Sequence, residues 1–421
     1  MNRHDLQQLA RYMRWQDTNE NKRALKTGLS LSLLKPLREW VYSFAAFCRK
    51  RQVITPVPCD VLLLHYSQTS QARGYRDALV TSLRKRGLRV VETAIHKPKT
   101  VLSRRELLSP GWTFPHRYYF HAAYARWLIG YYQPKALLTD KNGSILAPFL
   151  KTFIQPYGKL VHIAHSIPTD NFRKFSMNAY DYYFLFGRSS LERLQKRQRF
   201  GTSQVFLTGT YAEKMPLQLP EKNTTVLILG TGPALEKTRR IQSAYAVIRA
   251  TAHRLPAFHF IVKPHPRSDK TVWLSDNPPD NLTVANPDEN IDTLLKNAFV
   301  AIGSFTNAAI DCALQQRPFI LVSEGDTDPQ LDIHRMAPLC NTAEQLANTI
   351  TTIAANPDTY RDHARNFADY HLSNGFTGPD TISALIYTLV MQGALAGGVT
   401  LTDTLFDGNS REGNLREGKA P

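Results

Sequence analysis

The stretch TTVLILGTG, residues 224–232, decides how this chain of 421 residues is organised. Four consecutive apolar residues followed by Gly-Thr-Gly are typical of a strand that is buried on both faces and ends in a glycine-rich turn. The segment before it, YAEKMPLQLPEKN (211–223), is rich in proline and charge and is typical of a linker. Because a strand pattern restarts after a linker, we predict a second domain.

Apolar strand patterns alternate with helical patterns on both sides of this linker. Such alternation is typical of parallel sheets joined by crossover helices. We therefore predict an α/β protein with two Rossmann-like domains that face a cleft, over residues 56–210 and 224–390, with a helical extension over 1–55 and a disordered tail over 397–421. The predicted strands are 59–66, 88–95, 134–140, 159–165, 181–187 and 203–209 before the linker, and 224–232, 258–266, 281–286, 298–304 and 317–323 after it.

Charge is distributed unevenly along the chain. The formal net charge is +17, and residues 1–200 alone carry 34 basic and 12 acidic side chains. This half should face something anionic, either a nucleic acid, a membrane surface or an acidic polymer. No nucleic-acid-binding module is recognisable, so we expect no nucleic-acid partner. The hydrophobic fraction of 43% excludes bulk disorder.

The cysteine content and the start of the chain indicate a cellular location. The four cysteines form no CxxC pair, which fits a reducing cytoplasm. The segment MNRHDLQQLARYMRW lacks the apolar core of a secretory signal, and no apolar run approaches the roughly twenty residues of a membrane span. We expect a cytoplasmic protein that is soluble or peripheral on the membrane.

The segment LSLSLLKPLREWVYSFAAFCRKR (29–51) is the clearest helix of the N-terminal extension. Its apolar residues recur at helical spacing and form one face, and three basic residues follow at its end. The pattern favours a helix that docks on the protein's own core. The alternative is a helix that lies on an anionic lipid surface. The face consists of Leu33, Leu37, Val41, Phe44 and Cys48.

Ligands of doubly wound sheets bind beyond the carboxyl ends of strands, so the residues that follow each strand are the candidates for a site. In VHIAHSIP (161–168), His165 follows a strand, where an imidazole can remove a proton from a hydroxyl near neutral pH. The alternative is a histidine that is hydrogen-bonded within its loop. His162 lies inside the strand pattern and is predicted to be part of the core.

A second candidate is the basic loop VKPHPRSD (262–269), which also follows a strand. Two prolines restrict the backbone around His265, and Lys263 and Arg267 add positive charge. Charge-assisted hydrogen bonds of this kind suit a phosphate oxygen. The alternative is an ordinary basic loop on the surface.

A third candidate is AIGSFTNAAIDCALQQRPFIL (301–321), in which a strand leads through a hydroxyl-rich turn into a helix. Ser304, Thr306 and Asn307 are all helix-capping types, and together with free helix amides they could bind an anion. The alternative is simple capping. The sequence contains no GxxxxGK[ST], GxGxxG or HExxH motif, and we expect no metal site.

In this order, the segments resemble those of the CDP-glycerol glycerophosphotransferase family and its capsule-building relatives, over roughly residues 159–390. The stretch that contains KPHP and the later Ser/Thr turn is also similar to bacterial sialyltransferases and Kdo transferases. These groups share a glycosyltransferase-B (GT-B) type fold with two domains. The matching segments are VHIAHSIP, NAYDYYFLFGRSSLERL, VFLTGTY, FIVKPHP and AIGSFTNAAIDCALQQRPFIL.

The resemblance implies a role for each matching residue. His165 would be the general base, and His265 would contact the donor phosphate. Ser304 and Thr306 would hold the same phosphate, and Asp311 matches an acidic residue of the following helix. Ser166 replaces the usual glycine after the first histidine, and residues 1–150 match no part of the family.

The sequence and the resemblance together predict a transferase with an N-terminal acceptor domain and a C-terminal nucleotide-donor domain. The donor would be a CDP or CMP derivative, used as a substrate without a tightly bound cofactor. Its phosphate would be held by Lys263, His265, Arg267, Ser304, Thr306 and Asn307. The acceptor would be a surface polysaccharide, a teichoic-acid-like polymer or a lipid-linked glycan. The alternatives are a sialic acid or Kdo transferase and a non-catalytic protein that binds an anionic polymer.

Overall fold

The computed structural model describes residues 30–404 of the chain, with interruptions. The interruptions are 112–115, 141–144, 168–179, 198, 200, 269, 274–277, 305, 307 and 324–330. Asn307 therefore lies outside the described residues, as do 1–29 of the predicted helical extension.

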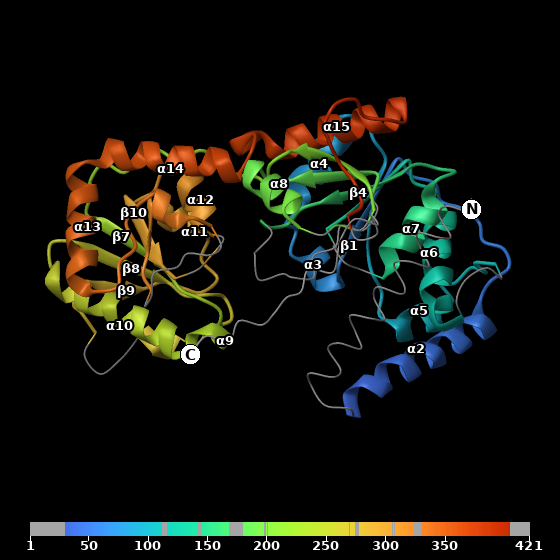
Figure 1. The fold of residues 1–421 in the computed structure, drawn as a ribbon, viewed down its shortest axis with the longest axis horizontal. Coiled ribbons are helices and arrows are strands. Elements are labelled where there is room, and N and C mark those ends of the chain that lie inside the picture. Colours follow the sequence, from blue (N-terminus) through green and yellow to red (C-terminus); the bar gives the residue numbers. More distant parts are fainter. Residues whose placement is uncertain are drawn as a thin grey trace.

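Two sheets, one on each side of the linker, organise the described residues (Figure 1). The strand order is β12-β6-β5-β4-β3-β1-β2 in the first sheet and β11-β10-β7-β8-β9 in the second. All neighbouring strands are parallel except β12, which pairs with β6 in the antiparallel direction. The strands are β1 (Val61–His65), β2 (Val90–Ala94), β3 (Ala136–Thr139), β4 (Lys159–Ile163), β5 (Tyr182–Leu185), β6 (Ser203–Leu207), β7 (Thr225–Leu229), β8 (His259–Lys263), β9 (Leu282–Val284), β10 (Val300–Gly303), β11 (Phe319–Leu321) and β12 (Val399–Leu401).

Helices connect the strands and cover both faces of each sheet (Figure 1). Those before the linker are α2 (Ser30–Arg49), α3 (Gln68–Ala72), α4 (Asp77–Lys85), α5 (Pro98–Arg104), η1 (His116–Tyr118), α6 (Tyr119–Tyr132), α7 (Leu146–Ile154) and α8 (Arg188–Gln195). Those after it are α9 (Pro233–Glu236), α10 (Arg239–Arg254), η2 (Lys270–Trp273), α11 (Ile291–Leu295), α12 (Ala308–Leu314), η3 (Ile333–Arg335), α13 (Ala343–Ala355), α14 (Pro357–His371), η4 (Gly375–Thr377) and α15 (Gly378–Gln392).

The apolar strands alternate between two cores, as a sheet covered on both faces requires. In β1, Leu62 and Leu64 pack into the core beneath α6 and α7, whereas Leu63 packs into the core beneath α4 and α15. In β7, Ile228 belongs to the core under α10 and α13, and Leu229 belongs to the core under α11, α12 and α14. Each strand predicted from the sequence is present, and the prediction of two Rossmann-like domains is confirmed.

The C-terminal segment departs from the predicted division of the chain. Helix α15 packs on α4 and contributes Ile382 and Ile386 to the core of the first sheet, although the sequence assigned residues up to 390 to the second domain. Residues 399–401, predicted to be disordered, form β12 at the edge of the first sheet. Both expectations were wrong because these contacts join residues about 200 positions apart for β12 and β6 and about 300 positions apart for α15 and α4, which local patterns do not reveal.

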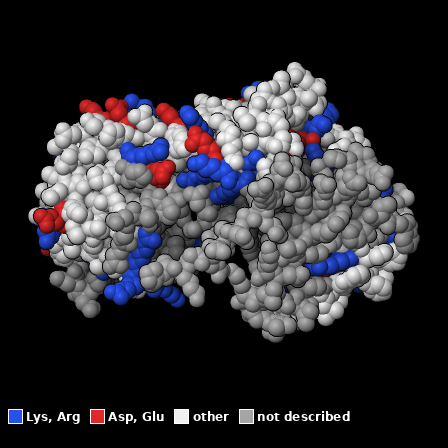
Figure 2. Space-filling model, viewed as in Figure 1, with Lys and Arg blue, Asp and Glu red and all other residues white. Residues whose placement is uncertain are grey.

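The crossing from the second domain back to the first forms a packed seam between α14 and α8 (Figure 1). His371 Nδ1 lies 2.8 Å from Ser189 Oγ, and Tyr370 Oη donates to Glu192 Oε2 at 2.6 Å. A Cβ at Gly187 would lie 2.6 Å from the carbonyl carbon and oxygen of His371, so only glycine permits this approach. Figure 2 shows two lobes with a hollow between them and basic side chains gathered along their junction.

Helix α2 docks on the protein, as the sequence favoured, but not through the predicted face. Its docked side carries Ser43, whose hydroxyl donates to the Arg117 carbonyl at 2.7 Å and accepts from the Phe120 amide at 3.2 Å. The predicted apolar face points outward, because Leu37 is 61% exposed and Phe44 is 71% exposed. Helix α2 therefore packs one side against the core of the first domain and exposes a second, apolar side to solvent.

Candidate functional site

The carboxyl end of β8 carries the loop with Lys263, His265 and Arg267, next to the glycine-rich exit of β7. The Gly230 amide donates to the Lys263 carbonyl at 3.0 Å, which joins the two exits. A Cβ at Gly232 would lie 3.9 Å from Nε2 and Cδ2 of His265, so this edge of the imidazole faces the glycine. Because Gly232 has no side chain, space remains beside Nε2 of His265, the ring nitrogen that could contact a ligand.

The tautomer of His265 follows from its backbone contact. The Arg267 amide donates to His265 Nδ1 at 3.1 Å, so in the neutral ring the proton is on Nε2. Partial burial lowers the pKa of His265, the charges of Arg267 and Lys263 lower it further, and Glu236 opposes them. His265 is thus a neutral N–H donor at neutral pH, and the exposed Arg267 is the cationic group beside it.

Lys263 is held by the protein itself. Its ammonium group donates to the carbonyl of Pro264 at 3.2 Å and to the carbonyl of Pro287. Partial burial lowers its pKa, and Asp288 and Glu289 oppose this shift. In this arrangement two of its three N–H groups fix the loop, and its predicted role at a phosphate stays a prediction.

The hydroxyl turn after β10 lies on the other side of β7 from the His265 loop, since β10 and β8 both flank β7. Ser304 is 2% exposed and donates its hydroxyl proton to the Val322 carbonyl at 3.2 Å. Thr306 Oγ1 accepts from the Ala308 amide at 3.2 Å, which is the geometry of a helix cap. Both hydroxyls have structural partners here, and their predicted role in phosphate binding is untested.

Asp311 contacts the linker. Its carboxylate lies 3.3 Å from Lys214 Nζ, which also approaches Asp292 at 3.6 Å. Burial lowers the pKa of Lys214, but the two carboxylates outweigh it and hold that pKa above its ordinary value. Asp311 and Asp292 therefore anchor the linker to α12 and α11 through Lys214, and the supporting role of Asp311 at the phosphate stays a prediction.

In the first domain, His165 follows β4 and its side chain is exposed. Ile167, two residues further on, is 2% exposed and packs in the core of the second domain together with Leu229 and Ile310. The turn that carries His165 therefore reaches the second domain. No hydrogen bond or ring contact joins His165 to His265 within the part of the chain that the structure describes.

His162 is a core residue, as the sequence predicted. It is 2% exposed, its ring stacks on Tyr183 with centroids 4.1 Å apart, and neither ring nitrogen has a hydrogen-bond partner of normal geometry among the described residues. Burial and the nearby His165 lower its pKa to about 3, with weak opposition from the backbone of Asp140. His162 is therefore neutral throughout the physiological range.

A buried polar cluster at the ends of β1 and β3 was missed by sequence reasoning. The Arg76 guanidinium, 2% exposed, pairs with Asp140 and donates to His65 Nδ1. This leaves the proton of neutral His65 on Nε2, which donates to Glu92 at 3.0 Å. Burial and Arg76 lower the pKa of His65 against the opposing effect of Glu92 and Asp140. Among the residues that the structure describes, Arg76 Nε and Asp140 Oδ1 have no hydrogen-bond partner.

The sequence contained one usable signal for this cluster. His65 and Asp140 are the polar residues that close the apolar strands CDVLLLHY and PKALLTD, so the strand-end rule applied to them as it did to His165. Arg76 gave no signal, because one arginine among many basic residues is not distinguished by composition. Arg240 was also missed: its Nε and Nη2 lie 3.0 and 2.7 Å from Ser323 Oγ, near the end of β11.

Two further properties concern metals and membranes. Within the described ranges, no group of three or more His, Cys, Asp or Glu side chains is arranged to hold a metal ion. Among the helices of the described chain, none combines the length and apolarity that crossing a membrane requires.

Comparisons with known proteins show the fold. The calicheamicin glycosyltransferase CalG4 has a TM-score of 0.50 at 12% identity, over 81% of this chain and 100% of that one. The UDP-GlcNAc 2-epimerase from Neisseria meningitidis, solved with UDP-GlcNAc, has a TM-score of 0.50 at 12% identity, over 79% and 99%. MnaA from S. aureus, solved with UDP, has a TM-score of 0.51 at 10% identity, over 79% and 97%.

The sequence itself has no comparable match. No protein-family model and no curated protein matches it. The two Rossmann-like domains are thus of the GT-B type, as expected, whereas membership of the CDP-glycerol glycerophosphotransferase family stays a resemblance.

Proposed function

We propose that this chain is a transferase that moves a glycosyl or glycerophosphate group from a nucleotide-activated donor to a hydroxyl group of a surface glycan or teichoic-acid-like polymer. The observation that carries the proposal is the geometry of His265, whose Nε2–H edge faces Gly232 across the joined exits of β7 and β8. The calicheamicin glycosyltransferase and the proteins solved with UDP-GlcNAc and UDP share this fold and support a nucleotide-linked donor.

On the donor side, the neutral imidazole of His265 would donate a hydrogen bond to a charged phosphate oxygen, and the exposed Arg267 would supply the positive charge. Arg240 adds a second cation close to the end of β11. These groups would stabilise the negative charge that develops on the leaving nucleotide. The resemblance favours a CDP or CMP derivative, and we expect the donor to be used without a tightly bound cofactor.

On the acceptor side, His165 would take the proton of the attacking hydroxyl group. Its exposed imidazole stands on the turn that reaches the second domain, where a donor bound at His265 and an acceptor bound to the first domain could meet. A positioned base contributes about 10² to 10⁴ in rate. The exposed position of His165 leaves room for an acceptor to approach it.

The test combines a donor screen with three substitutions. CDP-glycerol, CDP-ribitol, CMP-sialate, CMP-Kdo and UDP-sugars are offered with glycan acceptors, and the released nucleotide is measured. His165→Ala should lose about 10² to 10⁴ in turnover and keep its donor affinity. His265→Ala should weaken donor binding about 10-fold or more, the effect of losing one charge-assisted hydrogen bond.

Gly232→Ala probes the same donor contact without altering His265. The φ of Gly232 is −71°, and its added Cβ would make only ordinary contacts at 3.9 Å, so the fold should persist. Donor affinity should fall because the Cβ fills the space beside Nε2. Release of nucleotide from CMP-sialate or CMP-Kdo alone would favour a sialic acid or Kdo transferase. Absence of turnover with every donor, together with retained polymer binding, would favour a non-catalytic binding protein.

We also infer that the outward face of α2 rests on an anionic membrane surface. Leu37, Trp40, Val41 and Phe44 are between 50% and 71% exposed and lie on one side of the helix. The exposed Arg38 and Arg49 belong to the same helix. A helix with aromatic and aliphatic residues on one face and basic residues beside them is typical of membrane interfaces.

Vesicle sedimentation tests this surface. Binding to vesicles that contain phosphatidylglycerol should exceed binding to pure phosphatidylcholine and should weaken with salt, because exposed charges are screened within about 10 Å at 0.1 M. Phe44→Glu should abolish it. Met391→Glu, which changes an exposed apolar residue on α15, is the matched control and should bind as the unaltered chain does. Equal binding to both kinds of vesicle would contradict the inference.

A further inference from the structure

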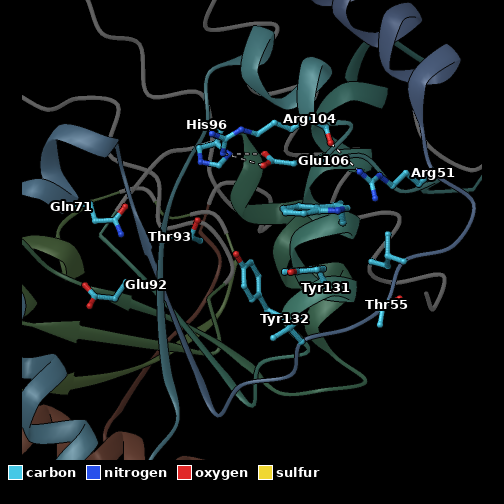
Figure 3. A pocket seen from close by; sticks show the side chains of 13 residues that line it. Arg51, Thr55, Gln71, Glu92, Thr93, His96, Arg104, Glu106, Tyr131 and Tyr132 are labelled. Carbon is cyan, nitrogen blue, oxygen red and sulfur yellow. Dashed lines mark hydrogen bonds and ion pairs between the residues drawn. The ribbon is translucent and has the colours of Figure 1, made fainter.

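A cavity of about 660 Å³ lies at the carboxyl end of the edge strand β2, between α3, α5, α6 and the segment after α2 (Figure 3). This volume is within the range of 300 to 1,000 Å³ that is typical of small-molecule sites. Glu92 lines it and also accepts from His65, so the cavity adjoins the buried cluster of His65, Arg76 and Asp140. No sequence motif pointed to this place.

The charged side chains that line the cavity have partners within the protein. His96 Nδ1 lies 2.6 Å from Glu106 Oε2, and the two point toward one another in Figure 3. Arg104 approaches the same carboxylate at 3.8 Å. Arg51 donates to the carbonyls of Arg105 and Arg104 at 3.0 and 3.2 Å. The charged residues of the lining are two arginines and two glutamates, Arg51, Arg104, Glu92 and Glu106, so their formal charges sum to zero and favour neither an anionic nor a cationic ligand.

These groups retain hydrogen-bonding capacity despite their pairing. A carboxylate has about four lone-pair sites and a guanidinium has five N–H donors, so Glu106 and Arg51 keep acceptors and donors for a ligand. Donors and acceptors that converge without net charge suit a neutral ligand whose groups both donate and accept. Hydroxyl groups have this property.

Part of the remaining wall of the cavity is aromatic. Trp127 and Tyr131 stack with their ring centroids 5.1 Å apart, and Tyr132 meets Tyr131 edge-on at 4.8 Å. Because the rings pack against one another, they form a preformed aromatic surface, and Figure 3 shows Tyr131 and Tyr132 below His96 and Glu106. A ligand that fits both sides has C–H surface on one side and hydroxyl groups on its edges, which describes a sugar ring.

We propose that this cavity binds a neutral sugar unit of the acceptor, away from the place of transfer. Strand β2 is three positions from β4 in the sheet, so the cavity lies about 14 Å to the side of the strand that leads to His165. A sugar in the cavity is therefore not the one that reacts. It belongs to an acceptor of several units, which is held at two places. This inference rests on the proposed function, because it assigns a subsite to the acceptor.

The binding test uses neutral sugars as probes: glucose, galactose, N-acetylglucosamine, N-acetylgalactosamine and their disaccharides, with glucuronate and sialic acid as anionic comparisons. Ligand-observed NMR should detect at least one neutral sugar, with millimolar affinity, and no preference for the anionic ones. Thr55→Trp places an indole at an exposed position on the cavity wall and should abolish binding. Thr81→Trp, at an exposed position on α4, should not change it.

Glu106→Gln gives a second measure that keeps the shape of the wall. Losing a charged acceptor should weaken sugar binding about 10-fold or more. Absence of binding by every neutral sugar, preference for the anionic sugars, or equal binding by Thr55→Trp would overturn the subsite. Donor affinity is measured on the same variants: donor binding without sugar binding refutes this inference alone, whereas sugar binding without donor binding refutes the proposed function.

Discussion

The buried His162 makes a quantitative prediction about acid stability. In an unfolded chain its pKa is near 6.5, whereas in the folded protein burial lowers the pKa to about 3. Between these values the unfolded state binds a proton that the folded state does not. Stability is therefore lost as the pH falls below about 6.5, and no further loss occurs below about 3.

The magnitude follows from the shift. Each pKa unit corresponds to about 1.4 kcal/mol, so at pH 5 this residue alone should lower the free energy of unfolding by about 2 kcal/mol relative to neutral pH. His371 acts in the same direction, because burial and Arg193 lower its pKa to about 4. Together they should remove about 4 kcal/mol at pH 5, a large share of the 5 to 15 kcal/mol of a typical domain.

The substitution His162→Phe isolates the effect. Phenylalanine can keep the stacking on Tyr183, and it removes no hydrogen bond of normal geometry to any residue that the structure describes. Urea unfolding at pH 7.5 and pH 5 should show that the variant loses about 2 kcal/mol less than the unaltered chain. His253→Gln, at an exposed position on α10, is the control and should leave the difference unchanged. If His162→Phe lost as much stability as the unaltered chain, a neutral buried histidine at this position would be ruled out.

Two further predictions concern the core and the thiols. Arg317 is completely buried, and its guanidinium donates to backbone carbonyls that include those of Leu295 and Ala298 at 3.2 Å. Arg317→Met should therefore lower the free energy of unfolding, measured by urea titration, by about 3 to 5 kcal/mol. A loss below about 1 kcal/mol would contradict this prediction. Of the four cysteines only Cys48 is exposed. A thiol reagent should therefore modify one thiol rapidly in the native protein and no thiol rapidly in Cys48→Ser. Rapid modification of a second thiol would contradict the burial of the other three cysteines.

The strands could be predicted from the sequence because the relevant physics is local. A strand buried on both faces must be apolar throughout, so segments such as TTVLILGTG stand out against their surroundings. The return of α15 and β12 to the first domain could not be predicted in this way. Strand β12 is stabilised by backbone pairing with β6, and Val399–Leu401 carry no pattern that distinguishes them from the tail that follows.

The candidate site shows a second limit of the same kind. The strand-end rule located the turns of His165 and His265 and the hydroxyl turn, because topology determines where the strand ends lie. It could not show which polar atoms are already engaged. The ammonium group of Lys263 and the hydroxyl of Ser304 both bind backbone carbonyls, and these partners come from residues 24 and 18 positions away. The residue type indicates which ligand a side chain could bind. Backbone carbonyls that lie nearby in space determine how many of its hydrogen-bond donors remain available to that ligand.

Some basic side chains of the N-terminal half are likewise engaged within the protein, and this narrows the choice of an anionic partner. Part of that charge stabilises the fold: Arg76 pairs with Asp140, and Arg199 donates to the carbonyls of Leu194 and Gln195 at 2.8 Å. These cations are buried and cannot meet an anionic partner. The charge that remains available lies on exposed residues, some of them on α2 beside its apolar face. An anionic polymer in solution would use the exposed charge alone, whereas a lipid surface would use the charge and the apolar face together, which favours the membrane.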